Sequence, residues 1–184
     1  MEKDFIMHYG NIKYHAIEDG VGIRTALFVS GCRNRCEGCF QPQTWDFDYG
    51  EEFTIHTVHD ILESLKDPYV AGLSILGGEP FEPENQAPLE TLTAKVKTLF
   101  PDKDIWVYSG YTFEELLDEN SACHTDFTLS MLKNIDILVD GRFMKEKANK
   151  MLSYKGSENQ RIIDVNASLA NNTVVLSEYN ERKK

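Results

Sequence analysis

The chain of 184 residues carries 30 Asp and Glu but only 19 Lys and Arg, which gives a formal net charge of −11 at pH 7. This acidic balance argues against a general nucleic-acid binder, because contacts to phosphate groups need a basic surface. The first residues lack the apolar segment of a signal peptide, and no stretch approaches the length of a membrane-spanning helix. We expect one folded domain over residues 1–184, located in the cytoplasm and without membrane contact.

Short apolar runs alternate along the chain with segments of helical periodicity. In chain order the sequence predicts a strand at 23–29, a helix at 57–66 capped by Thr57, a strand at 71–76, a helix around 89–99, a strand at 104–108, a short helix opened by a Thr112–Glu115 capping box, a helix around 126–133 and a strand at 135–139. Residues 160–165 and 173–176 are further strand candidates. The alternation indicates βαβ units, and therefore an α/β fold with a mostly parallel sheet.

Three of the four cysteines lie in one loop directly after the first expected strand, at positions 32, 36 and 39. An ordinary [4Fe–4S] cluster takes four cysteines, one for each iron. With three at hand, one iron keeps an open position, which is the feature that separates catalytic from structural metal centres. A disulfide framework is not favoured without signs of secretion. A structural zinc site, with Cys123 or His124 as the fourth ligand, stays open as an alternative.

Polar or glycine-containing segments follow each of the four expected strands. In a parallel sheet the ligand site lies beyond the carboxyl ends of the strands, so these segments are expected to converge on one site. Gly77 and Gly78 lack side chains and would let the backbone approach a ligand closely, while Glu79 or the carbonyls of its turn can accept hydrogen bonds. The four segments are Cys32–Cys39, Gly77–Glu79, Ser109-Gly110 and Asp140-Gly141.

Three arginines, Arg24, Arg33 and Arg35, surround the cysteine loop with few acids nearby in the sequence. They either belong to a solvated loop or help to hold an anionic cluster, a cofactor carboxylate or a docking partner. The five histidines are scattered, and none is expected to act as a general base.

The Cys-x3-Cys-x2-Cys loop, followed by Gly77-Gly78-Glu79-Pro80, resembles the radical S-adenosylmethionine (SAM) enzymes. Among these, the chain is similar to the proteins that activate anaerobic ribonucleoside-triphosphate reductase. That similarity runs through the motifs at 19–25, 32–45, 77–80, 104–111, 139–143 and 156–161, roughly residues 8–165. The resemblance implies a single radical SAM domain over residues 1–184, built as a partial (β/α) barrel of the radical SAM type.

The resemblance also implies the chemistry. Cys32, Cys36 and Cys39 would ligate three irons of a [4Fe–4S] cluster, and the methionine end of SAM would bind the fourth. Reductive cleavage of SAM would yield a 5′-deoxyadenosyl radical, which takes a hydrogen atom from a glycine in the large subunit of the reductase and leaves a glycyl radical. A one-electron donor such as a reduced flavodoxin would be a second partner. No catalytic side chain is required, because the cluster and SAM carry the reaction.

For SAM itself the resemblance implies a cofactor site of Gly38, Cys39, Phe40, Gly77, Gly78, Glu79, Ser109 and Asp140. Family members usually have an aromatic or apolar residue just before the third cysteine, to pack the adenine. Gly38 stands there in this chain, so its backbone and Phe40 are expected to take over that contact. For Asp140 a simple turn is the competing interpretation. The functional alternatives are an activase of another glycyl-radical enzyme, a small-molecule radical SAM enzyme, and a zinc-binding module without catalysis.

Overall fold

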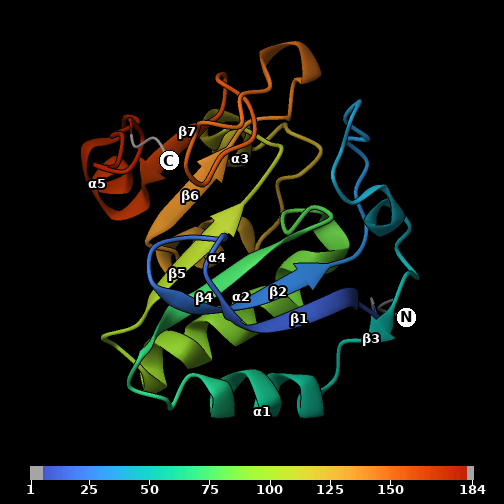
Figure 1. Ribbon diagram of the computed structural model, residues 1–184, viewed down its shortest axis with the longest axis vertical. Coiled ribbons are helices and arrows are strands. Elements are labelled where there is room, and N and C mark those ends of the chain that lie inside the picture. The colour runs from blue at the N-terminus through green and yellow to red at the C-terminus, as the bar shows by residue number, and fades with distance from the viewer. Residues whose placement is uncertain (1–5, 182–184) are drawn as a thin grey trace.

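The computed structural model, which describes residues 6–181, contains a seven-stranded sheet with the strand order β3-β1-β2-β4-β5-β6-β7 (Figure 1). Four central strands run parallel to one another: β2 (Ile23–Val29), β4 (Val70–Gly77), β5 (Asp104–Tyr108) and β6 (Ile137–Asp140). They correspond to the four predicted strands. The prediction of an α/β fold with a mostly parallel sheet is therefore confirmed.

The edges of the sheet are antiparallel. β1 (His8–Ala16) pairs with β2, β3 (Glu51–Glu52) pairs with β1, and β7 (Arg161–Asp164) pairs with β6. Taking residues 23–29 as the first strand was wrong, because β1 precedes it. β1 escaped prediction because it is mostly polar and half-buried or exposed, with no buried apolar run. Of the two late strand candidates, the first forms β7 and the second forms only an isolated bridge between Ile163 and Leu176.

Within residues 6–181, five α-helices pack on one face of the sheet and share one apolar core with it. They are α1 (Ile55–Ser64), α2 (Pro83–Leu99), α3 (Phe113–Leu117), α4 (Thr128–Lys133) and α5 (Val165–Asn171), and two short 3-10 turns occur at η1 (Pro42–Trp45) and η2 (Lys145–Lys147). None of the helices between residues 6 and 181 has the length and apolar character needed to cross a membrane.

Side-chain caps explain where the helices begin. The predicted capping box of Thr112 and Glu115 opens α3 and is confirmed. Helix α1 begins earlier than predicted, because its cap is Thr54 and not Thr57. Thr57 is the third residue of the helix and forms a capping box with Thr54, in which each side chain accepts a hydrogen bond from the backbone N–H of the other residue. Helix α2 also begins earlier, with Pro83 in its first turn, where the missing N–H costs nothing.

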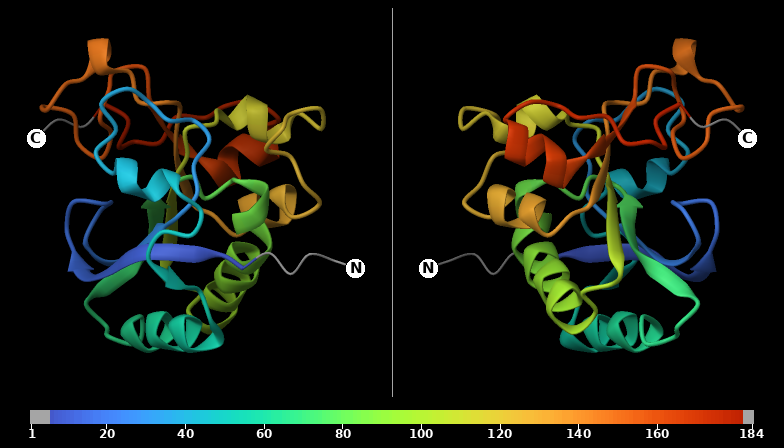
Figure 2. Two further views of the ribbon diagram at one scale, coloured as in Figure 1. Left: turned by 90° about the vertical axis from the view of Figure 1, so that its right-hand side faces the viewer. Right: turned by 90° about the vertical axis from the view of Figure 1, so that its left-hand side faces the viewer.

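The opposite face of the sheet carries no α-helix among the described residues and is covered instead by two irregular segments (Figure 2). One is the cysteine loop between β2 and η1, and the other is the segment 141–160 between β6 and β7. Phe28, Leu76 and Val139 point to this side and form part of the floor beneath the two segments. The space between floor and cover is the candidate site.

Candidate metal and cofactor site

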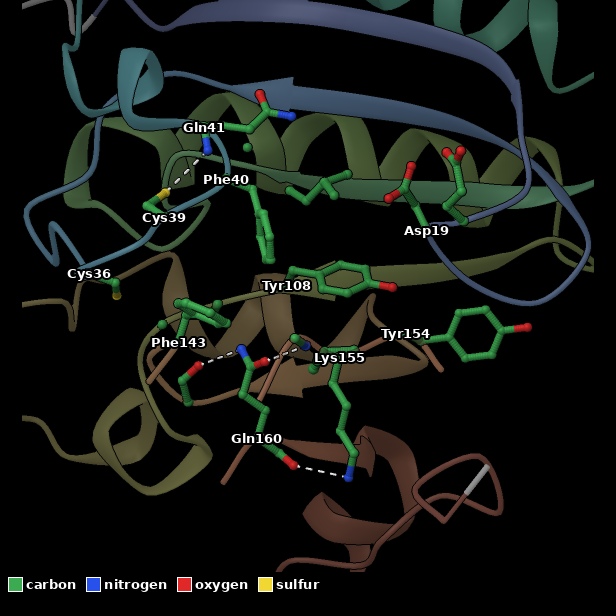
Figure 3. Close-up of a pocket in the computed structure, with 18 of the residues that line it drawn as sticks. Asp19, Cys36, Cys39, Phe40, Gln41, Tyr108, Phe143, Tyr154, Lys155 and Gln160 are labelled. Atoms are coloured by element: carbon green, nitrogen blue, oxygen red, sulfur yellow. Dashed lines mark hydrogen bonds between the residues drawn. The ribbon is translucent and has the colours of Figure 1, made fainter. Parts of the chain in front are cut away.

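A cavity of about 1080 Å³ lies between the face of the sheet opposite the α-helices and the two irregular segments that cover it. This is slightly more than the usual range of small-molecule sites, roughly 300–1,000 Å³. Figure 3 shows Cys36 and Cys39 near one end, Asp19 near the other, and the ring of Tyr108 between them. The following predicted residues line it: Cys32, Cys36, Cys39, Phe40, Gly77, Gly78, Glu79 and Ser109. The structure thus brings together most of the residues that the sequence singles out.

The cysteine loop is tied to η1 at its start. Near its start, Gly31 N donates to Thr44 O at 2.8 Å and Cys32 N donates to Trp45 O at 3.2 Å, which ties it to η1. At its far end, Gln41 N donates to Cys39 Sγ at 3.4 Å. Cys32 is buried, and burial raises the pKa of its thiol to about 11. A metal that binds such a thiol displaces its proton, so the three thiols are suitable ligands for a metal centre.

Within residues 6–181, no three His, Cys, Asp or Glu side chains lie close enough together to hold a single metal ion. The donor set itself is soft and made of thiols, which is the set that iron–sulfur clusters use. Three thiols facing one cavity therefore fit the predicted cluster in their chemistry.

The Gly77-Gly78-Glu79 turn is joined to the root of the cysteine loop. Gly78 N donates to Val29 O at 2.7 Å, and Glu79 N donates to Gly31 O at 2.8 Å. A Cβ at Gly77 would lie 2.7 Å from Val29 N, and one at Gly78 would lie 2.6 Å from Gly31 O. Both positions therefore need glycine because neighbouring backbone atoms leave no room for a Cβ. This reason differs from the one that the sequence suggests, the close approach of the backbone to a ligand.

The carboxylate of Glu79 is buried and accepts hydrogen bonds from three segments. The donors are Phe81 N at 3.0 Å, Ser109 Oγ at 2.8 Å, Gly110 N at 2.7 Å and Asn34 Nδ2 at 3.0 Å. Burial nevertheless raises the pKa of Glu79 to about 7, because the loss of hydration outweighs these donors. Ser109 lines the cavity, but its hydroxyl group serves Glu79.

Phe40 stands at the mouth of the cavity with its side chain 79% exposed. Its ring lies 5.2 Å from the ring of Phe143, centroid to centroid, so the cysteine loop and the segment after β6 meet there. Gly38 does not line the cavity. It has a φ of +77°, a conformation that favours glycine, and its place in the loop is therefore explained by the turn.

Asp140 also lies outside the cavity lining, although Gly141 next to it belongs to the lining. Its buried carboxylate accepts from Phe113 N at 2.8 Å and from Arg161 Nε at 3.0 Å. These contacts join β6 to α3 and β7.

The two residues considered as a fourth zinc ligand lie apart from the cysteine loop. Cys123 is fully buried, and its thiol lies 3.1 Å from Ser121 Oγ and 3.7 Å from Glu115 O. His124 Nδ1 lies 2.9 Å from Leu116 O. Neither residue lines the cavity that the other three cysteines share.

The three arginines have different surroundings. Arg24 is fully buried and pairs with Asp104 at 2.7 Å, so it is a structural residue of the sheet and does not surround the loop. Arg33 pairs with Glu82 and Glu84. Arg35 is exposed and has no ion pair among the described residues.

Several residues of the cavity were not predicted as site residues. Asp19, Tyr108, Phe143, Lys155 and Gln160 line it. Asp19 Oδ2 and the Tyr108 hydroxyl are buried and have no hydrogen-bond partner among the described residues. All but Lys155 fall in motifs that carry the family resemblance, so membership in those motifs could have identified them as site residues.

Comparisons with known proteins agree with this site. A family model described as a 4Fe-4S single cluster domain matches residues 18–163. The anaerobic ribonucleoside-triphosphate reductase-activating protein of Enterobacteria phage T4 is 38% identical over 156 residues, 85% of this chain and 93% of the relative. The chain belongs to this family. Proteins of the same name from Vibrio cholerae and Escherichia coli K12 are 41% and 36% identical, over 82% and 78% of this chain and 94% and 90% of the relatives. Membership confirms the predicted family and makes the chain an iron–sulfur protein of the radical SAM oxidoreductase type.

Proposed function

We propose that this chain activates an anaerobic ribonucleoside-triphosphate reductase by reductive cleavage of SAM at a [4Fe–4S] cluster. The observation that carries the proposal is that Cys32, Cys36 and Cys39 line one cavity together with the turn Gly77–Glu79, at the carboxyl ends of neighbouring parallel strands. In open parallel sheets this edge is where ligands bind. The names of the relatives supply the reductase as the target.

In this proposal residues 1–184 are a single radical SAM domain that acts in the cytoplasm, and β2, β4, β5 and β6 with their helices are a partial (β/α) barrel. Cys32, Cys36 and Cys39 hold three irons, and one iron is left for SAM. When bound, the cluster would supply the one-electron reduction that cleaves SAM, and the radical chemistry that follows would be directed at a glycine of the reductase large subunit. A reduced flavodoxin is the proposed electron donor.

The chain's own residues place SAM in the cavity. Phe40, with Phe143 beside it, offers an aromatic surface for the adenine at the mouth of the cavity. The carbonyl groups of the turn around Glu79 are acceptors for the amino group of SAM, and the Glu79 carboxylate acts through its own contacts, because Ser109 and three further donors tie it to the segments beside that turn. Gly38 contributes the turn that carries Cys39. Asp140 acts indirectly, because its contacts fix the end of β6 where Gly141 enters the cavity.

Electron paramagnetic resonance tests the proposal. The chain is purified and reconstituted without oxygen, then mixed with the reductase large subunit, a reductant and SAM. We expect about four irons per chain, as one cluster requires, and a glycyl-radical signal that needs all three additions. Zinc without iron after anaerobic purification would support the zinc-binding module instead. A cluster that cleaves SAM without producing the glycyl radical would point to a different radical SAM reaction.

A further inference from the structure

Asn34 lies in the middle of the segment between Cys32 and Cys36, and both ends of its side-chain amide are engaged. Nδ2 donates to Glu79 Oε2 at 3.0 Å, and Oδ1 accepts from Arg142 Nε at 3.0 Å. The two partners come from the turn after β4 and from the segment after β6. A single side chain therefore connects the cysteine loop to both of its neighbours at the carboxyl edge of the sheet.

Arg142 extends this connection to a fourth segment. Its guanidinium group donates to both carboxylate oxygens of Glu115 at 3.0 and 3.1 Å and lies 5.2 Å from the centre of the Tyr111 ring. Glu115 is itself held, because its carboxylate accepts from Thr112 N at 2.8 Å in the capping box of α3. The resulting chain of contacts, Glu79–Asn34–Arg142–Glu115, has a bidentate ion pair at its outer end, and such pairs fix geometry well.

The packing around Asn34 leaves little freedom. A Cβ at Gly110 would lie 2.4 Å from Asn34 Nδ2 and 3.3 Å from Glu79 Oε2, so the amide fills the space that this glycine provides. Burial raises the pKa of the Cys32 thiol, and the backbone N–H groups of Asn34 and Arg35, which lie near the sulfur, act against that rise. Fixing the Asn34 side chain therefore also fixes the backbone donors that face the sulfur.

We propose that Asn34 is a positioning residue of the cysteine loop: by bridging Glu79 and Arg142 it holds the Cys32–Cys36 segment in the conformation that receives the cluster and keeps the backbone N–H groups of that segment near the sulfur of Cys32. This inference rests on the proposed cluster. Hydrogen bonds to the sulfurs are one of the terms that set the reduction potential of an iron–sulfur cluster, so the bridge should also raise that potential.

The test compares Asn34→Ala and Asn34→Asp with Arg35→Ala, a matched control in the same loop whose exposed side chain makes no hydrogen bond or ion pair among residues 6–181. Hydrogen exchange of residues 32–39 in the metal-free chain reads the loop directly. We expect exchange about tenfold faster in Asn34→Ala, the factor that the loss of one net hydrogen bond gives. Asn34→Asp should also exchange faster than the unmodified chain, because it loses the donor to Glu79 and its carboxylate faces that of Glu79, while it keeps the acceptor for Arg142. Arg35→Ala should match the unmodified chain.

The reconstituted proteins give the second readout. Asn34→Ala should keep less iron, and the midpoint potential of the cluster that remains should be more negative than in the control. If Asn34→Ala does not fold, Arg142→Ala opens the same bridge from its exposed end and should give the same changes. Normal exchange and an unchanged potential in these variants would overturn the inference while leaving the proposed function intact. An unmodified chain without any cluster would overturn the proposed function, and exchange alone would then decide whether Asn34 positions the loop.

Discussion

The two ends of the cavity differ in how their polar groups are satisfied. At the cysteine end, Glu79 accepts four hydrogen bonds and Asn34 uses both ends of its amide. At the other end, Asp19 Oδ2 and the Tyr108 hydroxyl are buried without a partner among residues 6–181. Burial raises the pKa of both groups.

This difference separates two kinds of residue in one site. An unpaired buried polar group costs about 1–3 kcal/mol, so a molecule that fills the far end gains by donating a hydrogen bond to Asp19 or by pairing with Tyr108. At the cysteine end the protein has already made these bonds, and substitutions there alter the shape of the loops before they alter any contact to a ligand.

The largest effect is expected at the cysteine end, where each thiol is needed. Cys36→Ala should lose nearly all of the iron that the unmodified chain binds, about four per chain for one cluster. Cys123→Ala is the matched control. Its thiol is buried outside the cavity, so iron content should be unchanged and only a small loss of stability is expected. Iron analysis after anaerobic reconstitution is the measurement, and equal loss in both variants would refute the three-ligand site.

The sequence predicts most of the site residues at the cysteine end of the cavity and few at the Asp19 end. The strands β2 and β5 are predicted residue for residue, and the convergence of their loops follows from parallel pairing. Local patterns do not contain the register that brings Asn34 against Glu79, because it depends on contacts between residues 45 positions apart. Arg24 shows the same limit, since its neighbours in sequence give no sign of the buried pair with Asp104.

Gly78→Ala tests whether the turn after β4 belongs to the loop scaffold. The new Cβ would lie 2.6 Å from Gly31 O and 2.9 Å from Thr44 O, and both are backbone atoms that cannot rotate away. We expect a loss of about 3 kcal/mol in the free energy of unfolding together with weaker cluster retention. Denaturant unfolding and iron analysis measure the two effects. A stable variant that keeps its cluster and loses only SAM affinity would show that the glycine serves the cofactor directly.

Glu79 should leave a signature in the dependence of stability on pH. Its folded-state pKa is raised to about 7 by burial, above the usual value of 4.5, so the folded chain binds this proton more tightly than the unfolded chain. The stabilising contribution is complete below the unfolded-state value of 4.5 and is lost as the pH rises through the folded-state value of about 7, by up to about 3 kcal/mol. The other carboxylates titrate equally in the unmodified chain and in a Glu79→Gln variant, so their contributions cancel in the difference between the two free energies of unfolding.

The measurement is the free energy of unfolding of the metal-free chain and of Glu79→Gln between about pH 4 and 8.5. The stability of the unmodified chain relative to the variant should fall as the pH rises through 7 and become constant about one pH unit above the folded-state pKa. A difference that is independent of pH, or that grows toward neutral pH, would mean that the hydrogen-bond donors outweigh burial.

The smallest effect is expected at the end of β5, where removing the hydroxyl group of Ser109 should lower the free energy of unfolding and removing that of its neighbour Tyr108 should not. Ser109→Ala removes a hydroxyl group that donates to Glu79 at 2.8 Å and accepts from Tyr111 N at 3.0 Å, so it should cost about 1–2 kcal/mol in the free energy of unfolding. Tyr108→Phe removes a buried hydroxyl group that has no partner in the described chain, and it should leave stability unchanged or raise it by up to about 1 kcal/mol. Chemical denaturation of the two metal-free variants measures both changes under one condition. A loss of stability in Tyr108→Phe as large as that in Ser109→Ala would mean that the far end of the cavity is satisfied in solution, and the contrast between the two ends would disappear.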